Sequence, residues 1–319
     1  MITRRNAIAG ALILALLAIG PAQAQAQDKP AEIRIGTQKG GFFPAVRQRH
    51  TVEDAFKPLR IEIKWVDFQF GPPLLEAINV GAVDFGFVGD SPPIFAQAGG
   101  ARIRYVAAVK SDGNNQAIIV PKDSAIRAVA DLKGKRVAFG KGSSAHNLLV
   151  AALEQAGLSY GDISPAPLAP ADATAAFLKG SVDAWSIWDP YLALAELKEN
   201  VRVIAFDRDV HKPNAFYVAG TDFVSKYPAL VAKLNAVFSS EGRWAESHHA
   251  EVAKAQSEAT GVDLEAVKRF VARSNYRVVP VDDETIRSQQ AIADRFAKLG
   301  LIPKPVNVSE IIWKWSGGS

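Results

Sequence analysis

Short apolar segments alternate with helix-like segments over the first two thirds of the chain. The segment 61–68 alternates apolar and polar side chains, as a half-exposed strand does. Other segments with the composition of strands are 33–37, 83–88, 103–109, 116–120, 136–139, 163–168, 184–188, 201–206 and 215–219. Helices are predicted between them over 72–78, 92–98, 145–156, 171–178 and 190–197. This alternation favours an α/β fold, in which parallel sheets carry helices on both faces.

The pattern changes after residue 223. From there it predicts helices alone, over about 227–258, 263–273, 283–299 and 308–314. We interpret these segments as a C-terminal helical appendix that packs on one side of the α/β part.

The α/β part contains an internal repeat. Residues 81–84 read Gly-Ala-Val-Asp, with Asp90 six residues further on, and residues 180–183 read Gly-Ser-Val-Asp, with Asp189 six residues further on. We interpret the repeat as two similar α/β lobes whose matched loops follow the C-terminal ends of strands. Ligands bind at that edge of an open α/β sheet. Two such lobes would face one another across a cleft that closes by hinge motion.

The chain is expected to cross between the lobes twice. One crossing is predicted at 112–115, before the strand 116–120, and the other at 211–214, before the strand 215–219. The predicted division is residues 27–114 and 216–319 in lobe one and residues 115–215 in lobe two.

Residues 1–26 have the pattern of a secretory signal peptide. Arg4 and Arg5 precede an apolar run over 7–19, and alternating alanines and glutamines follow it. This run of 13 residues is shorter than the roughly 20 that a membrane-spanning helix needs. We therefore expect the mature protein to be released outside the cytoplasm.

Composition excludes several classes of function. The chain of 319 residues has no cysteine, which rules out disulfides, thiolate metal sites and a cysteine nucleophile. Its formal net charge is only +4 and it has no polybasic run, so nucleic acid is not the expected partner. The five histidines show no His-Glu-x-x-His spacing, and neither a Gly-x-Ser-x-Gly motif nor a phosphate-binding loop is present. We therefore expect no catalytic residues, no metal and no cofactor.

Three predicted helices begin directly after cleft loops that carry small or acidic residues. Asp90 precedes one of these helices, Ser143 and Ser144 precede the second, and Asp189 precedes the third. The first turn of a helix has unpaired N–H groups and partial positive charge, so it can hold an anion. An ordinary helix cap is the alternative explanation for Asp90, Ser143 and Asp189.

Other side chains are expected around the same cleft. Lys39, which precedes Gly40, would offset the carboxylates if it reached the ligand. Trp188, beside a helix start, is the expected wall for an apolar ligand tail, and Phe216-Tyr217 is a further candidate lining. Trp185 lies in the middle of a strand and is expected in the core.

Five sequence blocks are similar to the aliphatic sulfonate-binding proteins of bacterial ABC importers. They are Gln-Lys-Gly at 38–40, Leu-Leu-Glu-Ala-Ile-Asn-Val-Gly at 74–81, Gly-Asp-Ser-Pro-Pro-Ile-Phe-Ala-Gln-Ala at 89–98, Lys-Gly-Ser-Ser-Ala-His-Asn at 141–147 and Asp-Ala-Trp-Ser-Ile-Trp-Asp-Pro-Tyr at 183–191. The resemblance extends in order over the whole mature chain. It implies a two-lobed type II periplasmic binding protein fold, with a double hinge between the lobes.

The resemblance also implies a function. A monomeric periplasmic protein would capture an aliphatic sulfonate and deliver it to an ABC permease with its ATPase at the inner membrane, as a source of sulfur. The matching positions imply ligand contacts from Gln38, Asp90, Ser91, Gly142, Ser143, Ser144, His146 and Trp188. The loop positions add Lys39, Gly40 and Asp189 as candidates.

Several alternatives remain open from the sequence. Proteins that bind taurine, sulfate esters or nitrate have similar motifs, and Asp90 or Asp189 could meet the ammonium group of taurine. An enzyme on the same scaffold and a sensory ligand-binding domain are the alternatives from other classes.

Overall fold

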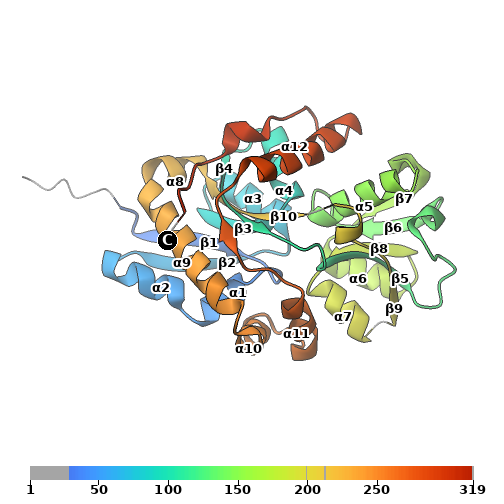
Figure 1. Ribbon diagram of the computed structural model, residues 1–319, viewed down its shortest axis with the longest axis horizontal. Helices are drawn as coiled ribbons and strands as arrows, with labels where there is room; N and C mark the ends of the chain where they lie inside the picture. Colours follow the sequence, from blue (N-terminus) through green and yellow to red (C-terminus); the bar gives the residue numbers. More distant parts are fainter. Residues whose placement is uncertain (1–28, 199, 212, 318–319) are drawn as a thin grey trace, which may run out of the picture.

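The computed structural model describes residues 29–198, 200–211 and 213–317, which form two β-sheets with helices on both faces of each sheet (Figure 1). Residues 1–26, predicted to be a signal peptide, lie outside the described residues. Within the described part, no helix has both the length and the apolar character needed to cross a membrane.

The larger sheet, sheet A, has the strand order β11-β4-β10-β3-β1-β2. Its strands are β1 (Glu32–Thr37), β2 (Glu62–Asp67), β3 (Phe85–Gly89), β4 (Ile103–Lys110), β10 (Asn214–Gly220) and β11 (Val278–Val279). β1 pairs in parallel with β2 and β3, whereas β10 is antiparallel to both β3 and β4. Sheet A is therefore mixed rather than purely parallel.

Helices from both ends of the chain cover sheet A. One face packs against α1 (Phe43–Gln48), α2 (Thr51–Phe56), α8 (Thr221–Lys226), α9 (Pro228–Ala245), α10 (His249–Thr260) and α11 (Leu264–Ala272), with the short 3-10 helix η1 (Lys57–Leu59) after α2. The other face packs against α3 (Gly71–Asn79), α4 (Ser91–Ala98), α12 (Asp283–Lys298) and the 3-10 helix η5 (Val308–Ile311). The C-terminal helices, orange to red in Figure 1, thus lie on both faces of sheet A.

The smaller sheet, sheet B, has the order β7-β6-β8-β5-β9 and lies on the right in Figure 1. Its strands are β5 (Gln116–Pro121), β6 (Arg136–Phe139), β7 (Ser164–Pro167), β8 (Ala184–Trp188) and β9 (Val201–Phe206). One face is covered by η2 (Val129–Leu132), α5 (Ser144–Gln155) and η3 (Tyr160–Asp162), and the other by α6 (Pro170–Leu178) and α7 (Tyr191–Lys198). The short 3-10 helix η4 (Asp207–Asp209) follows β9.

The internal repeat corresponds to the same turn in the two sheets. Asp84, just before β3, accepts a hydrogen bond of 2.8 Å from the backbone N–H of Arg34 in β1. Asp183, just before β8, accepts one of 2.7 Å from the N–H of Arg136 in β6. Because β3 and β8 each end at the edge that faces the other sheet, the repeat brings Asp90 and Asp189 to equivalent places.

Two residues that we predicted to line the ligand cleft lie in the core around sheet A. Phe216 and Tyr217 in β10 are 1% and 0% exposed, because β10 is an inner strand and its side chains enter the cores on both faces. Tyr217 lies among stacked rings, of which Phe43 and Phe238 have centroids 4.1 Å apart. The prediction that Phe216 and Tyr217 line a ligand pocket is wrong. Trp185 is buried, as predicted, at 2% exposed.

The C-terminal region differs from its predicted all-helical pattern in two ways. The predicted helix 227–258 is two helices, α9 and α10, separated at His248, whose backbone is not helical. Residues 278–279 form β11, which pairs with the outer edge of β4. A two-residue strand has too short a pattern to detect in the sequence, and the unpaired edge of β4 provides its hydrogen bonds.

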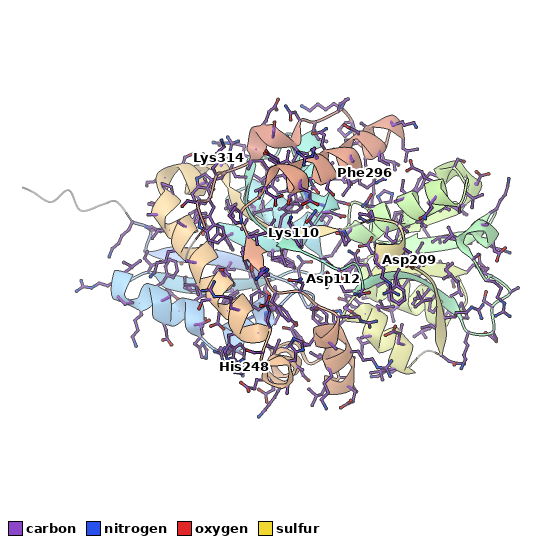
Figure 2. All side chains as sticks on the ribbon, in the orientation of Figure 1. Lys110, Asp112, Asp209, His248, Phe296 and Lys314 are labelled. Carbon is purple, nitrogen blue, oxygen red and sulfur yellow. The ribbon has the colours of Figure 1, made fainter. Side chains whose placement is uncertain are left out.

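The chain passes between the sheets at two neighbouring crossings. Residues 111–115 form the first crossing, between β4 and β5, and residues 207–211 with 213 belong to the second, between β9 and β10. The backbone N–H of Arg208 donates a hydrogen bond of 2.9 Å to the carbonyl of Gly113, so the crossings contact each other directly. Figure 2 labels Asp112 in the first crossing and Asp209 in the second. The division into lobes at residues 114 and 216 stays a prediction.

Close packing of the crossings predicts a large cost for a side chain at Gly113. Gly113 has φ +69°, and an added Cβ would lie 2.5 Å from the backbone N of Arg208. Gly134 has a similar φ of +74°, but nothing lies within 4 Å of its added Cβ. We expect Gly134→Ala to lose about 1–2 kcal/mol for the left-handed backbone alone, and Gly113→Ala to lose about 1–3 kcal/mol more for overpacking. Urea unfolding of both variants measures the difference, and equal losses would contradict close packing of the crossings.

Candidate functional site

A cavity of about 110 Å³ lies between the two sheets, beside both crossings. Its walls come from the loops after β1, β3, β6 and β8, from the crossings, and from the segment around α11. These are the strand ends at which open α/β sheets bind ligands. The cavity is therefore the candidate ligand site.

Ser143 and Ser144 line the cavity at the beginning of α5. The hydroxyl of Ser143 donates a hydrogen bond of 2.7 Å to the carbonyl of Gly140 and makes no bond to the first turn of α5. The alternative that Ser143 only caps this helix is therefore wrong. Ser144 Oγ accepts a hydrogen bond of 3.1 Å from the backbone N–H of Asp90. A Cβ at Gly89 would lie 1.9 Å from Ser144 Oγ, so this contact requires glycine at position 89.

Asp90 is fully buried and lies behind the cavity wall rather than on it. Its side chain does not cap α4, which corrects the alternative prediction of a helix cap. Instead the carboxylate accepts hydrogen bonds of 2.8 Å from Ser91 Oγ and 3.2 Å from Asn147 Nδ2. Since α5 carries Asn147 and the loop after β3 carries Asp90, the carboxylate joins sheet B to sheet A.

His211, in the second crossing, lies between two buried carboxylates. Its Nε2 is 3.3 Å from Asp90 Oδ2, and its Nδ1 is 2.9 Å from Asp207 Oδ1. Burial alone would lower the pKa of His211, but the contacts with Asp207 and Asp90 outweigh it and raise the pKa to about 10. Burial would likewise raise the pKa of Asp90, yet His211 holds it below its ordinary value. A positively charged His211 therefore neutralises part of the carboxylate charge behind the cavity.

Asp189 lies on the cavity wall and is 2% exposed. Its Oδ1 accepts a hydrogen bond of 3.0 Å from the backbone N–H of Ala193, so here the predicted cap does exist. Arg273, just after α11, places Nε 2.8 Å from Asp189 Oδ2. Burial raises the pKa of Asp189 to about 7, while the charge of Arg273 opposes the rise. The buried Asp189 carboxylate is thus paired with a cation.

Of the remaining predicted ligand contacts, some line the cavity and one lies outside it. Gln38, Gly40 and Trp188 line the cavity, and a Cβ at Gly40 would lie 3.0 Å from the carbonyl of Asp189. Lys39 has an exposed side chain outside the cavity, while its carbonyl accepts a hydrogen bond of 2.8 Å from Gln256. The structure therefore does not bring Lys39 to the cavity.

His146 and two other predicted ligand contacts, Gly142 and Ser91, lie behind the cavity wall. His146 is 2% exposed and stacks on Phe139 with ring centroids 4.5 Å apart. Burial lowers the pKa of His146 to about 4, so the ring is neutral, and its Nδ1 accepts a hydrogen bond of 3.3 Å from the N–H of Gly142. Ser91 is buried against Asp90. Which of the predicted residues contact a ligand stays a prediction, but His146, Gly142, Ser91 and Asp90 do not line the cavity.

Several aromatic lining residues were not among the candidate ligand contacts predicted from the sequence. Phe42, Phe87, Phe270 and Tyr276 give the cavity an apolar surface. Phe42 belongs to a loop beside the predicted Gln-Lys-Gly block, which is a usable signal. Phe270 and Tyr276 come from the region interpreted as an appendix, where no local pattern distinguishes a cavity residue from a core residue. Among the residues that the structure describes, no three histidine, aspartate or glutamate side chains gather as a metal site.

Comparison with known proteins gives consistent matches. The family described as NMT1/THI5 like matches residues 66–248. A protein of Escherichia coli (strain K12), named as an aliphatic sulfonates-binding protein, is 40% identical over 311 residues that cover 97% of each chain. The alkanesulfonate-binding protein SsuA from Xanthomonas axonopodis pv. citri, bound to MOPS, superposes with a TM-score of 0.86 at 40% identity, over 90% of this chain and 99% of that one. The periplasmic aliphatic sulphonate binding protein SsuA from Escherichia coli superposes with a TM-score of 0.81 at 39% identity, over 91% and 95% of the two chains.

The charged state of His211 predicts a pH dependence of stability. An unfolded histidine releases its proton near pH 6.5, whereas folded His211 holds it to about pH 10. Its contribution to stability is therefore complete below pH 6.5 and is lost as the pH rises through 10. At pH 7 we expect His211→Gln to lose about 3–5 kcal/mol, since it leaves buried carboxylates unpaired.

The measurement is urea unfolding of the wild type and the variant at pH 7, 8.5 and 10. The stability difference between them should shrink steadily with rising pH. His249→Gln, at an exposed position, is the control for loss of a histidine. A difference that stays constant up to pH 10 would show that His211 is not a charged partner of the two carboxylates.

Proposed function

The chain belongs to the NMT1/THI5-like family and, within it, to the aliphatic sulfonate-binding proteins, and we propose that it binds an aliphatic sulfonate in the cavity between its two sheets. The periplasmic binding protein fold expected from the sequence is confirmed by its superposition on the SsuA structures. The expectation of a binding protein rather than an enzyme agrees with what these relatives are named as.

The start of α5 beside a cavity with aromatic walls is the observation that carries the proposal. The first N–H groups of a helix have no acceptor within it, and Ser143 leaves those of α5 uncapped. Ser144 Oγ accepts a hydrogen bond from the backbone N–H of Asp90 and lies at the same helix start. A sulfonate stays a monoanion at physiological pH and has three acceptor oxygens. Donors at this helix start therefore match its head group.

The aromatic wall supports an aliphatic tail on the ligand. Trp188, Phe42 and Phe270 line the same cavity as the two serines. Burial of a hydrocarbon tail against these rings contributes about 25 cal/mol per Å² of apolar surface. Nitrate has no tail and would leave this surface unused, whereas a sulfate ester has both a similar head and a tail.

The carboxylates near the cavity disfavour taurine. An ammonium group on the ligand would need a free carboxylate, and the sequence offered Asp90 and Asp189 for that role. Asp90 is enclosed by His211, Asn147 and Ser91, and Asp189 is paired with Arg273. Both carboxylates already have cationic partners, so a ligand with an uncharged tail suits the cavity better.

The proposal also includes the compartment in which the ligand is bound and the transporter that receives it. We infer that the protein captures its ligand in the periplasm and delivers it as a monomer to an ABC permease with its ATPase at the inner membrane, to supply sulfur. The signal-peptide pattern of residues 1–26 and the periplasmic relative from Escherichia coli support this setting.

Calorimetric titration with hexane-1-sulfonate, taurine and nitrate tests the proposed ligand class. We expect hexane-1-sulfonate to bind most tightly, because it alone combines the anionic head with an uncharged apolar tail. Tight binding of nitrate alone would overturn the proposal, and preference for taurine would replace the ligand class with amino sulfonates.

Substitution of Ser143 by Asp tests the position of the head group. The new carboxylate remains an acceptable cap for α5 but occupies its first N–H groups and repels an anion. We expect the unliganded melting temperature to stay within about 2–4 °C, the shift that corresponds to ~1 kcal/mol. Hexane-1-sulfonate at 100 times its Kd should stabilise the wild type by about 2.7 kcal/mol and the variant not at all.

Asn307→Asp is the matched control for Ser143→Asp. Asn307 caps η5 by accepting a hydrogen bond from the N–H of Ser309, and it does not line the cavity. This substitution adds the same charge at another helix start, and the ligand-induced stabilisation should be retained. Full stabilisation of Ser143→Asp by the ligand would show that the head group binds elsewhere.

A further inference from the structure

His146 belongs to the first turn of α5 and lies behind the wall of the ligand cavity. Its ring is 2% exposed and packs against four aromatic rings, at centroid distances of 4.5 to 5.9 Å. Phe139 and Tyr160 belong to β6 and η3, in the layers of sheet B. Phe95 and Phe296 belong to α4 and α12, which pack on sheet A. Rings from both sheets therefore hold the imidazole in place.

The imidazole makes one hydrogen bond within the described residues, and its partner is the loop before α5. Because burial lowers the pKa of His146 to about 4, the ring is neutral and has one nitrogen that can accept a hydrogen bond. That nitrogen is Nδ1, which accepts a bond of 3.3 Å from the backbone N–H of Gly142. The ring proton is therefore on Nε2, which has no hydrogen-bond partner among the described residues.

The loop before α5 leads directly into the proposed anion site. Gly142 has φ +70°, a left-handed backbone that glycine adopts without strain. The backbone N–H of Ser143 donates a hydrogen bond of 3.1 Å to the carbonyl of Gly140. The N–H groups of Gly142 and Ser143 are thus used to fold the loop. The next two N–H groups, of Ser144 and Ala145, have no acceptor within the helix, and the loop determines where they lie.

Donors that are already in place bind an anion more tightly than donors that binding must first order. A loop that moved freely in the unliganded protein would be ordered on binding, and this cost would reduce the affinity. The bond between His146 and Gly142 reduces the freedom of the loop before the ligand arrives.

We propose that His146 is a positioning residue for the anion site, which holds the N–H of Gly142 from behind and so fixes the start of α5 without touching the ligand. The inference rests on the proposed function, since it concerns the affinity of that site. The family resemblance implied a direct ligand contact for His146, and the structure instead places its ring between the two sheets, behind the cavity.

Two substitutions of His146 separate its role as an acceptor from its role in packing. His146→Asn keeps an acceptor, because the side-chain oxygen of asparagine is as many bonds from the backbone as Nδ1 is. His146→Leu fills the space between the rings but has no acceptor. In calorimetric titration with hexane-1-sulfonate, we expect the Kd to rise about three- to tenfold in His146→Leu, as for the loss of one hydrogen bond. The Kd of His146→Asn should stay below that of His146→Leu and close to the wild-type value.

Stability should follow the opposite order. His146→Asn leaves a small cavity and a buried amide N–H group without a partner, so we expect it to be no more stable than His146→Leu. Urea unfolding of the unliganded variants measures this order. A variant that is less stable yet binds more tightly would show that the acceptor, and not core packing, supports the site.

Phe177→Leu is the control for a loss of stability alone. Phe177 is 5% exposed, belongs to α6 on the opposite face of sheet B and does not line the cavity. Its substitution should destabilise the protein and leave the Kd for hexane-1-sulfonate at the wild-type value. A rise in Kd as large as that of His146→Leu would show that lost stability by itself weakens binding, and would overturn the proposal.

The remaining outcomes also decide the proposal. An unchanged Kd in His146→Leu, or equal rises in His146→Leu and His146→Asn, would overturn it. If either variant does not fold, the nitrogen chemical shifts of His146 in the wild type decide, by nuclear magnetic resonance. A proton on Nε2 and a bare Nδ1 are expected, and a proton on Nδ1 would overturn the proposal. Failure of the wild type to bind hexane-1-sulfonate would instead reject the proposed function.

Discussion

Neutralisation of buried carboxylates is the constraint on which the anion site and the arrangement of the sheets depend. The repeat brings one aspartate to the cavity region from each sheet, Asp90 after β3 and Asp189 after β8. Bare carboxylates at these places would be costly to bury and would repel an anionic ligand. His211 compensates Asp90, and Arg273 compensates Asp189. Each sheet therefore contributes a buried acid, and a cation from another segment makes the cavity acceptable to an anion.

These ion pairs also hold the two sheets together around the cavity. His211 lies in the second crossing and joins Asp90, from sheet A, to Asp207, which follows β9 directly. Arg273, from the helices packed on sheet A, reaches Asp189 on sheet B. Breaking either pair leaves a buried charge without its partner, which is strongly destabilising. The ion pairs between the sheets and the electrostatics of the cavity thus reinforce each other, and the start of α5 is where we expect N–H donors to meet the ligand.

Local patterns in the sequence were sufficient for the α/β architecture and for the loops around the cavity. Periodicity and helix-start residues depend on near neighbours, so the strands, the internal repeat and the serines at α5 were all predictable. The pairing of His211 with Asp90 and of Arg273 with Asp189 was not, because the partners lie 121 and 84 residues apart in the chain and only folding brings them together. The same applies to Phe270 and Tyr276 in the cavity wall and to β11, whose two residues pair with a distant edge. Conversely, Lys39 and His146 belong to blocks typical of the family, yet one side chain is exposed and the other is packed in the core.

A crystal structure of the protein with hexane-1-sulfonate tests the central claim most directly. The account predicts the sulfonate group within hydrogen-bond distance of Ser144 Oγ and the first N–H groups of α5, the tail against Trp188 and Phe42, and Asp189 still paired with Arg273. A sulfonate bound outside this cavity, or a tail that displaces Arg273 from Asp189, would contradict it.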